Sequence, residues 1–339
     1  MTHLFTSARR LALAFSAAAL LSACAVTQGA NTSSPDGSQP VRLAFLSASS
    51  ANTWLTASLD AMQQDAAKNN AEIVTFDAKF EPGVAAKQMQ DVIASGRYDG
   101  VFIATIDGVG AAPAVESAIQ AGLKVVVLNQ IIGTDLTTAD PQVEGVSASV
   151  LAPPQATGTR LGKLTVQACE GVNPCDVVFM YGAKGSPLDS AVRAGFDEQI
   201  ATNPAITVVA EGEGGYLGTD EPRKVTQDII QAHPHFNVLA GTGDQQIRGS
   251  VIALHDAGIT DVKLIGVGGS APAIEGVRDG TWYADVAGAP VTEGHVAFEA
   301  MMHALDGQDD GGIDVTTQLV DDGLITSQNV DKFTAQWQG

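Results

Sequence analysis

The side chains that could carry covalent chemistry in this sequence are few and lie far apart. Asp189 and Asp244 are the candidate pair of carboxylic acids near a predicted cleft, and acid–base catalysis needs two such groups within reach of a substrate. The G-x-S-x-G turn that presents a nucleophilic serine in many hydrolases is absent from the sequence. The sequence therefore predicts that the protein is not an enzyme. The alternative is an enzyme that uses Asp189 and Asp244.

Motifs for metals and cofactors are equally weak. The two histidines of the HPH stretch, residues 233–235, flank a proline that ends a helix, and no third zinc ligand accompanies them. The acidic stretch 306–314 partly imitates a calcium loop, but Thr317 stands where such loops carry a bidentate glutamate. GVGGSA and GTGD lack the G-x-G-x-x-G spacing of dinucleotide sites. We therefore predict no metal, no cofactor, and a surface turn at 306–314.

The segment 1–23 has the form of a secretory signal peptide, because two arginines precede the uncharged apolar run 11–23. That run is too short to cross the roughly 30 Å hydrocarbon core of a membrane as a helix. It ends in LSAC, residues 21–24, which resembles the lipobox of bacterial lipoproteins and predicts that Cys24 carries lipid. Residues 24–40 are small and polar, which predicts a flexible tether. The expected location is therefore outside the cytoplasm, on a membrane. An ordinary cleaved signal is the alternative.

The two remaining cysteines, Cys169 and Cys175, flank the turn-forming residues EGVNP. An exported protein folds where disulfides persist, so the sequence predicts that these two cysteines are bonded to each other. Two unpaired thiols are the alternative.

The charge of the chain limits its partners. The 339 residues carry 18 Lys and Arg against 38 Asp and Glu, for a formal net charge of −20. Nucleic acids and anionic lipid surfaces would be repelled by such a protein, so neither is an expected partner. The length, with 45% hydrophobic residues, is enough for two domains.

From residue 41 onward, short β-rich runs alternate with stretches of helical length. The predicted strands are VRLAFLS (41–47), EIVTF (72–76), GVFIAT (100–105), KVVVLN (124–129), DVVFMY (176–181), ITVVA (206–210), NVLAG (237–241), VKLIGV (262–267) and TWYADV (281–286). The predicted helices between and after them include 188–202, 221–232, 245–257 and about 290–305. This alternation predicts an α/β fold of two doubly wound parallel-sheet lobes joined by a multi-strand hinge, with a break near 145–155.

The residues just after each strand are the ones expected to bind a ligand, because open α/β sheets bind ligands at the carboxyl ends of their strands. These loops are small, polar and rich in glycine. They include SASSANTW, TIDG and NQIIG in the first half, and YGAKGSPLD, GTGDQ and GVGGSA in the second. Two such sets facing each other predict a polar cleft between two lobes.

The order of these stretches resembles that of the type I periplasmic binding proteins, specifically the ribose/galactose-type sugar-binding lipoproteins of ABC importers. The resemblance spans about residues 41–330 and is carried by SSANTWL, YDGVFIATID, AIQAGLKVVVLNQ, SAVRAGF, AHPHFNVLAGTGD and DGTWYADVAGAPVTEG. It implies an N-terminal lobe of residues 41–148 plus about 289–315, a C-terminal lobe of residues 149–288, and a hinge return with the C-terminal tail at 316–339.

The resemblance also implies that an aromatic side chain packs on the ligand while polar side chains bind its hydroxyl groups. Trp54 suits the aromatic role, because an indole face can pack on the C–H face of a sugar. The ligand-binding residues that the resemblance implies are Asn52, Trp54, Asp107, Asn129, Gln130, Lys184, Ser186, Asp189, Tyr216, Asp244 and Ser270. Asp107 and Asp244 could instead cap helices, which is common in such turns.

The sequence departs from the sugar binders at several of these places. Asn129 and Gln130 stand where many of them carry an Asp-Arg pair, so fewer charge-assisted hydrogen bonds are available. Glycines stand where polar contacts are common, at Gly243, Gly269 and Gly288. These glycines predict room for a ligand that is larger, less hydroxylated, or bound through backbone and water. Arg193 lies one position from a frequent ligand-binding arginine, and both a cleft and a solvent position stay open.

The function expected from these observations is that of a monomeric solute-binding lipoprotein. It would capture a small polar solute, a sugar or sugar-like polyol, in the cleft between its lobes and deliver it to an ABC permease in the membrane. The alternative is a sensor of the same fold that binds a non-sugar metabolite and signals to a membrane receptor.

Overall fold

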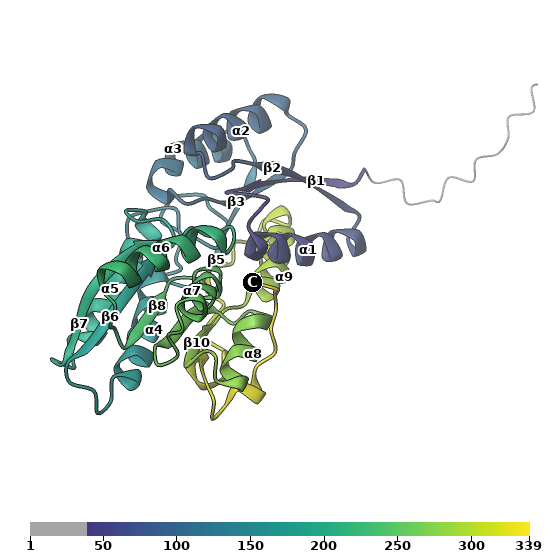
Figure 1. Cartoon of the computed structure of the whole chain (residues 1–339). Coiled ribbons are helices and arrows are strands. Elements are labelled where there is room, and N and C mark those ends of the chain that lie inside the picture. The colour runs from purple at the N-terminus through teal and green to yellow at the C-terminus, as the bar shows by residue number, and fades with distance from the viewer. Residues whose placement is uncertain (1–38) are drawn as a thin grey trace, which may run out of the picture. The chain divides into compact units, whose positions relative to one another are not determined.

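The structure is a computed structural model that describes residues 39–339 (Figure 1). The predicted signal peptide, the lipidation site Cys24 and the tether up to residue 38 lie outside the described residues. Within residues 39–339 the strands form two six-stranded sheets. The first contains β1 (Val41–Ser47), β2 (Ala71–Asp77), β3 (Gly100–Ala104), β4 (Lys124–Leu128), β5 (Ala148–Leu151) and β11 (Gly311–Asp314). The second contains β6 (Cys175–Tyr181), β7 (Ile206–Glu213), β8 (Val238–Gly241), β9 (Lys263–Gly268), β10 (Ala284–Ala287) and β12 (Leu324–Thr326).

The two sheets repeat one strand order. It is β11-β5-β4-β3-β1-β2 in the first sheet and β12-β10-β9-β8-β6-β7 in the second. Neighbouring strands are parallel, and β12 is the exception, since it pairs antiparallel with β10. The predicted class, two doubly wound parallel sheets, is confirmed. The strand order reverses beside β1 in the first sheet and beside β6 in the second, and such switch points open a crevice at the carboxyl ends of the strands.

Helices cover both faces of each sheet (Figure 1). The first sheet carries α1 (Thr53–Lys68) and α9 (Pro290–Leu305) on one face, and α2 (Pro82–Ser95) and α3 (Gly108–Gln120) on the other. The second sheet carries α4 (Pro154–Ala168) and α5 (Pro187–Ile200) on one face, and α6 (Asp220–Ala232), α7 (Asp244–Asp256) and α8 (Ala271–Asp279) on the other. We call each sheet with its helices a lobe. Among residues 39–339, no helix combines the length and the apolar character that crossing a bilayer requires.

The cores of the lobes follow from the apolar sequence of their strands. In β1, Leu43 and Phe45 face α1 and α9, whereas Ala44 and Leu46 face α2 and α3, and all four side chains are buried. A strand covered on both faces must be apolar at every position, unlike a strand with one side in water. This explains why the strands read as continuous apolar runs in the sequence.

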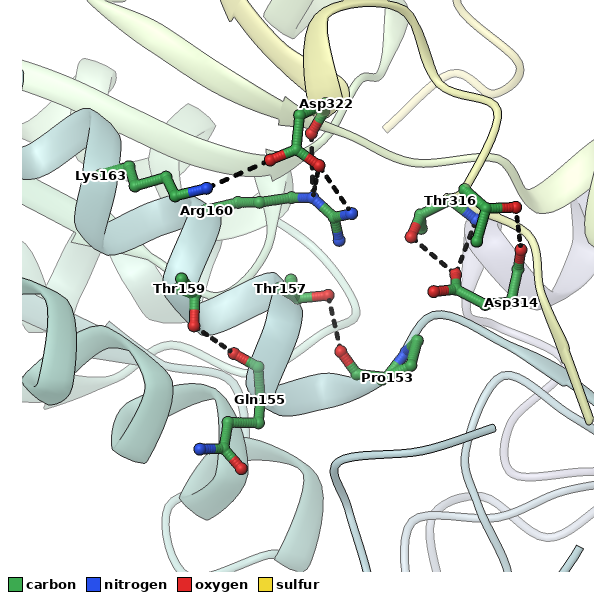
Figure 2. Close-up of polar contacts among 10 residues, drawn as sticks. Pro153, Gln155, Thr157, Thr159, Arg160, Lys163, Asp314, Thr316 and Asp322 are labelled. Carbon is green, nitrogen blue, oxygen red and sulfur yellow. Dashed lines mark hydrogen bonds and ion pairs between the residues drawn. The ribbon is translucent and has the colours of Figure 1, made fainter. Parts of the chain in front are cut away.

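The chain passes between the lobes after β5, after β10 and after β11, and a polar network holds the last of these passages (Figure 2). Asp314, at the end of β11, accepts hydrogen bonds from the backbone N–H and the hydroxyl of Thr316 at 2.8 and 2.6 Å. Further on, the carboxylate of Asp322 accepts from Arg160 at 3.1 Å and from Lys163 at 3.2 Å, both on α4. These bonds tie the returning chain to the first helix of the second lobe. Asp322 lies in the short 3₁₀ turn η1 (Val320–Gly323), and a second such turn, η2 (Val330–Lys332), follows.

The strands and helices predicted from the sequence lie close to the observed ones, with instructive exceptions. The stretch 306–314 was expected to be a surface turn, but its last four residues form β11, which pairs with β5. The first sheet also extends to Leu151 through β5, so the passage into the second lobe comes slightly later than residue 148. The strand expected at 281–286 begins only at Ala284, and the indole of Trp282, just before it, packs against Gly276. Short edge strands such as β11 depend on distant partners and leave little local signal.

Candidate functional site

A cavity of about 150 Å³, which we call the inner cavity, is lined by residues of both lobes. Its polar lining consists of Asn52, Thr105, Asn129, Gln130, Thr157, Tyr216, Thr242 and Gln245. Its apolar lining includes Trp54, Phe80, Ile106, Leu188, Val192 and Trp337. A wider cavity of about 460 Å³, the outer cavity, shares Phe80, Ile106 and Tyr216 with it and is lined by the loop 214–219. Both cavities lie at the carboxyl ends of parallel strands, where open α/β sheets bind ligands.

The inner cavity carries no formal charge on its walls. None of the described residues that line it has a carboxylate, ammonium, guanidinium or imidazole group. The phenol of Tyr216 stays neutral, because burial, together with the nearby charge of Asp189, raises its pKa well above 10. Among residues 39–339, no three His, Cys, Asp or Glu side chains gather to hold a metal. A charged ligand would lose its hydration here without finding an opposite charge, so the cavity suits an uncharged ligand.

Asn52 connects the two lobes across this cavity. Its side-chain oxygen accepts from the N–H of Leu55 at 3.0 Å and caps α1, and its amide nitrogen donates to the backbone carbonyl of Tyr216 at 3.0 Å. The same amide therefore holds the first turn of a helix in one lobe and a loop of the other. The cap fixes the side chain, so the contact between the lobes needs little further ordering.

Trp54 lines the cavity from the first turn of α1, and a buried acid holds it. Its indole Nε1 donates to Glu293 on α9 at 3.0 Å. Glu293 is 1% exposed, and this burial raises its pKa from 4.5 to about 8, although contacts with Trp54 and Asn129 lower the pKa in part. The carboxyl is therefore largely protonated at neutral pH. Glu293 was not among the expected site residues, because its partners lie far away in the chain.

Asn129 and Gln130 follow β4 and both line the inner cavity. Asn129 has a φ of 67°, a left-handed conformation that Asn tolerates better than most residues. Gln130 is 1% exposed and donates from Nε2 to the carbonyl of Ile106 at 3.3 Å. At the two positions where sugar binders often carry Asp-Arg, this chain thus presents neutral amides held by backbone geometry.

Tyr216 lines both cavities from the second lobe, and Asp189 fixes it from behind. The hydroxyl of Tyr216 donates to Asp189 at 2.9 Å and lies 3.2 Å from the hydroxyl of Thr242. The carboxylate of Asp189 also accepts from the N–H groups of Gly182 and Ala183, at 3.1 and 2.9 Å, and from another side chain, that of Ser186. Asp189 is completely buried and does not line the inner cavity. It positions Tyr216 and the loop after β6.

Besides Asn52, three of the implied ligand-binding residues use their side chains as helix caps. Asp107 accepts from the N–H of Gly110 at 2.8 Å and caps α3, Ser186 accepts from Asp189 at 3.1 Å, and Ser270 accepts from Ala273 at 3.3 Å. None of the three caps lines the inner cavity. For Asp107, a helix cap was the alternative to ligand binding, and its observed contact is that of a helix cap.

Asp244 is also directed away from the cavity, toward Asp285 on β10. Both carboxyls are completely buried, and burial raises the pKa of Asp244 to about 6 and that of Asp285 well above its ordinary value. Asp244 accepts from the N–H of Ser270 at 2.8 Å, and Asp285 accepts from the N–H of Gly269 at 2.8 Å. The pair therefore shares a proton and holds the turn between β9 and α8. Its neighbour Gln245 lines the cavity instead.

Lys184 and Arg193 belong to an ion cluster that does not line the inner cavity. Lys184 donates to Glu211 on β7 at 2.7 Å, and Arg193 contacts Glu211, Asp197 and the hydroxyl of Tyr181. The sequence left both a cleft and a solvent position open for Arg193. In the structure, its guanidinium group contacts residues within the second lobe instead. The sequence could not decide this, because Glu211 and Tyr181 come from two neighbouring strands.

Of the three glycines expected to leave room for a larger ligand, Gly269 and Gly288 are instead packed against backbone and a tryptophan, whereas Gly243 lines the inner cavity. A Cβ atom at Gly288 would lie 2.4 Å from the ring of Trp54, and one at Gly268 would lie 2.6 Å from the ring of Trp337. Gly269, next to it, packs against the backbone of Ala287, with 3.2 Å between such a Cβ and Cα. The space beside Gly269 and Gly288 is therefore not available to a ligand. This packing contributes to the small volume of the inner cavity.

Two doubly wound parallel sheets with an uncharged cavity between their loop-bearing edges define a two-lobed binding protein. A family model described as "periplasmic binding protein domain" matches residues 43–309, and the chain belongs to this family. Proteins of this family bind substrates for transport rather than convert them, so the chain is not an enzyme. The resemblance to ABC-importer binding proteins that the sequence indicated is confirmed.

Two curated relatives illustrate the family. The xylitol-binding protein of Mycolicibacterium smegmatis is 23% identical over 280 residues, which cover 83% of this chain and 76% of the relative. The ribose import binding protein of Salmonella typhimurium is 25% identical over 257 residues, which cover 76% of this chain and 82% of the relative.

Solved structures share the fold over most of the chain. An ABC transporter solute-binding protein from Mycobacterium smegmatis with bound glycerol has a TM-score of 0.75 at 23% identity and covers 88% of this chain and 99% of its own. A solute-binding protein from Bacillus halodurans with bound myo-inositol has a TM-score of 0.76 at 20% identity, with coverage of 88% and 99%. At these identities the likeness supports the fold.

Proposed function

We propose that this protein is the solute-binding component of an ABC importer and captures a small uncharged sugar or polyol between its two lobes. The observation that carries the proposal is the inner cavity, whose walls combine neutral amides and hydroxyls with the indoles of Trp54 and Trp337. Amides can donate to and accept from hydroxyl groups, and an indole face packs on C–H groups. The two curated relatives, named for ribose and for xylitol, support the same class of ligand and favour import over sensing.

Ligand capture would close the lobes. A solute that contacts Asn129 and Gln130 in the first lobe and Gln245 in the second favours the state in which these residues are close together. The moving bodies would be residues 41–148 plus about 289–315 and residues 149–288, with 316–339 as hinge return and tail. The sheet memberships of the strands support this division, and β5 continues the first sheet to Leu151. The closed form would then dock on the permease.

Calorimetric titration with uncharged polyols and sugars tests the proposal, and Gln245→Leu is the informative variant. The substitution keeps the bulk of the side chain but removes its hydrogen bonds to a ligand, so the affinity is expected to fall about tenfold or more while the melting temperature stays close to that of the parent. Gln308→Leu, at an exposed position, is the matched control and should bind normally. Equal affinity in both variants, or no binding of any uncharged solute by the parent protein, would contradict the proposal.

We further propose that residues 1–23 are removed on export and that lipid on Cys24 anchors a monomeric protein to the membrane. The lipobox-like LSAC supports this proposal, as does the extracytoplasmic location of the family. Such a location also permits a disulfide, and the sulfurs of Cys169 and Cys175 lie 2.11 Å apart.

Replacement of Cys24 by serine tests the anchor. A chain without its lipid has lost the roughly 0.8 kcal/mol that each buried CH₂ of an acyl chain adds to membrane binding, so it is expected to leave the membrane fraction. The measurement is the distribution of the protein between membrane and soluble fractions, with incorporation of labelled fatty acid. Cys169→Ser, which leaves the lipobox intact, serves as the control and should stay in the membrane fraction. A Cys24→Ser chain that still sediments with membranes would refute the anchor.

A further inference from the structure

The segment 334–339 returns to the binding site after η2. The end of the chain is marked in Figure 1 between α8 and α9. Trp337, the third residue from that end, is 4% exposed and lines the inner cavity, but it does not line the outer one. A residue that distant from every strand-end loop was not among the expected ligand-binding positions.

Contacts to both lobes hold this segment in place. The indole Nε1 of Trp337 donates to the carbonyl of Gly268, at the end of β9, at 2.7 Å, and its own carbonyl accepts from Ala271 on α8 at 3.0 Å. The preceding residue, Gln336, exchanges two hydrogen bonds with Thr292 on α9, at 3.0 and 2.9 Å. Four hydrogen bonds thus position one indole, two from each lobe.

The backbone around Trp337 is shaped to receive it. Gly268 has a φ of 149°, and a Cβ there would collide with the indole, so this position has to be glycine. The ring meets that of Trp54 edge to face, with centroids 5.5 Å apart and planes at 69°. Trp54 in turn fills the space over Gly288. Two indoles from opposite ends of the chain therefore form one aromatic wall of the inner cavity.

We propose that Trp337 is a specificity-determining residue of the inner cavity: it closes the cavity beside Trp54 and limits the ligand to a small uncharged polyol or monosaccharide. The cavity, at about 150 Å³, lies well below the roughly 300–1,000 Å³ of pockets for drug-sized ligands. Removing the indole would open the space over Gly268, and a buried apolar space of that kind can take additional ligand atoms. This inference rests on the proposed function.

The test measures the affinity of the whole purified protein for glycerol, xylitol, D-ribose, myo-inositol and sucrose by calorimetry. Trp337→Ala is expected to weaken the best small ligand about tenfold or more and to raise the ratio of myo-inositol to xylitol affinity by a similar factor. Trp337→Phe, which keeps an aromatic ring, should preserve the parental rank order. Trp337→Leu keeps apolar bulk without the ring and should show the same change in rank order if the alanine variant does not fold.

Trp282→Phe is the matched control, because Trp282 is also 4% exposed in the second lobe but does not line the inner cavity. It should lower the melting temperature without changing the order of affinities. If the Trp337→Ala and Trp337→Leu variants weaken all ligands by one common factor, or change none, Trp337 is only structural and the inference fails while the proposed function stands. If the parent protein binds no ligand of the series, the proposed function fails, and the inference falls with it.

Discussion

Glu293→Gln is expected to raise the free energy of unfolding by several kcal/mol at pH 8 and by little near pH 4.5. The folded protein keeps the Glu293 pKa at about 8 because the carboxyl is buried, whereas its ordinary value is 4.5. Between these two values the unfolded chain releases the proton that the folded chain retains. Stability therefore falls as the pH rises, by at most about 1.4 kcal/mol per pH unit, and levels off above pH 8.

The amide of glutamine fits the same place without a charge. Its side-chain oxygen can still accept from the indole of Trp54, so the contact that orients the indole is kept. Denaturant unfolding at pH 5, 6.5 and 8.5 measures the effect as the difference between variant and parent. This difference isolates Glu293, because the buried Asp244–Asp285 pair lowers stability with rising pH in both proteins.

Glu299→Gln, at an exposed position on the same helix, is the control and should change stability little at any pH. An advantage of Glu293→Gln that is equal at all three pH values would show that Glu293 does not titrate with a raised pKa. A loss of stability at pH 8.5 would show that the carboxylate is well paired in the folded state.

Asp189→Ala is expected to lower the free energy of unfolding by about 3 kcal/mol or more and to weaken ligand binding at the same time. The carboxylate accepts from the backbone of Gly182 and Ala183 and from the hydroxyls of Ser186 and Tyr216. Alanine leaves these donors without their acceptor in the interior, and each buried unsatisfied group costs about 1–3 kcal/mol. Binding suffers because Tyr216, which lines both cavities, is no longer fixed.

Asp228→Ala, which removes an exposed acid on α6, is the control for this prediction. That control should change stability by less than about 0.5 kcal/mol, as surface substitutions usually do. Denaturant unfolding gives the stability, and calorimetric titration gives the affinity. If both alanine variants behave alike, the network around Asp189 contributes little and Tyr216 does not depend on it.

The buried acids of this protein act on the cavity lining and not on the ligand. Glu293 orients Trp54, Asp189 orients Tyr216, and the Asp244–Asp285 pair holds the turn beside Gly268. The cavity itself remains neutral. Removing a charge from water in such a small cavity is costly. Because the acids lie behind the side chains that line the cavity, they hold these side chains in place while the cavity walls stay uncharged.

Much of the lining of the inner cavity could be predicted from the sequence, because strand-end loops contribute it. Asn52, Trp54, Asn129, Gln130 and Tyr216 were expected at the ligand and line the inner cavity. Gln245 could have been found, since it follows Asp244 within the loop GTGDQ. A loop sequence shows which side chains are near a site. It does not show which of two neighbours turns toward it.

The sequence by itself determined the alternation of strands and helices, and with it the two parallel sheets and the edge where a ligand binds, because apolar periodicity is a local property. Only the tertiary structure decided that Asp189 and Asp244 are structural, that Glu293 is buried, and that Trp337 joins Trp54. Each of these outcomes depends on contacts between residues far apart in the chain, and local patterns carry no information about such partners. The small volume of the inner cavity arises in the same way, from two indoles packed over two distant glycines.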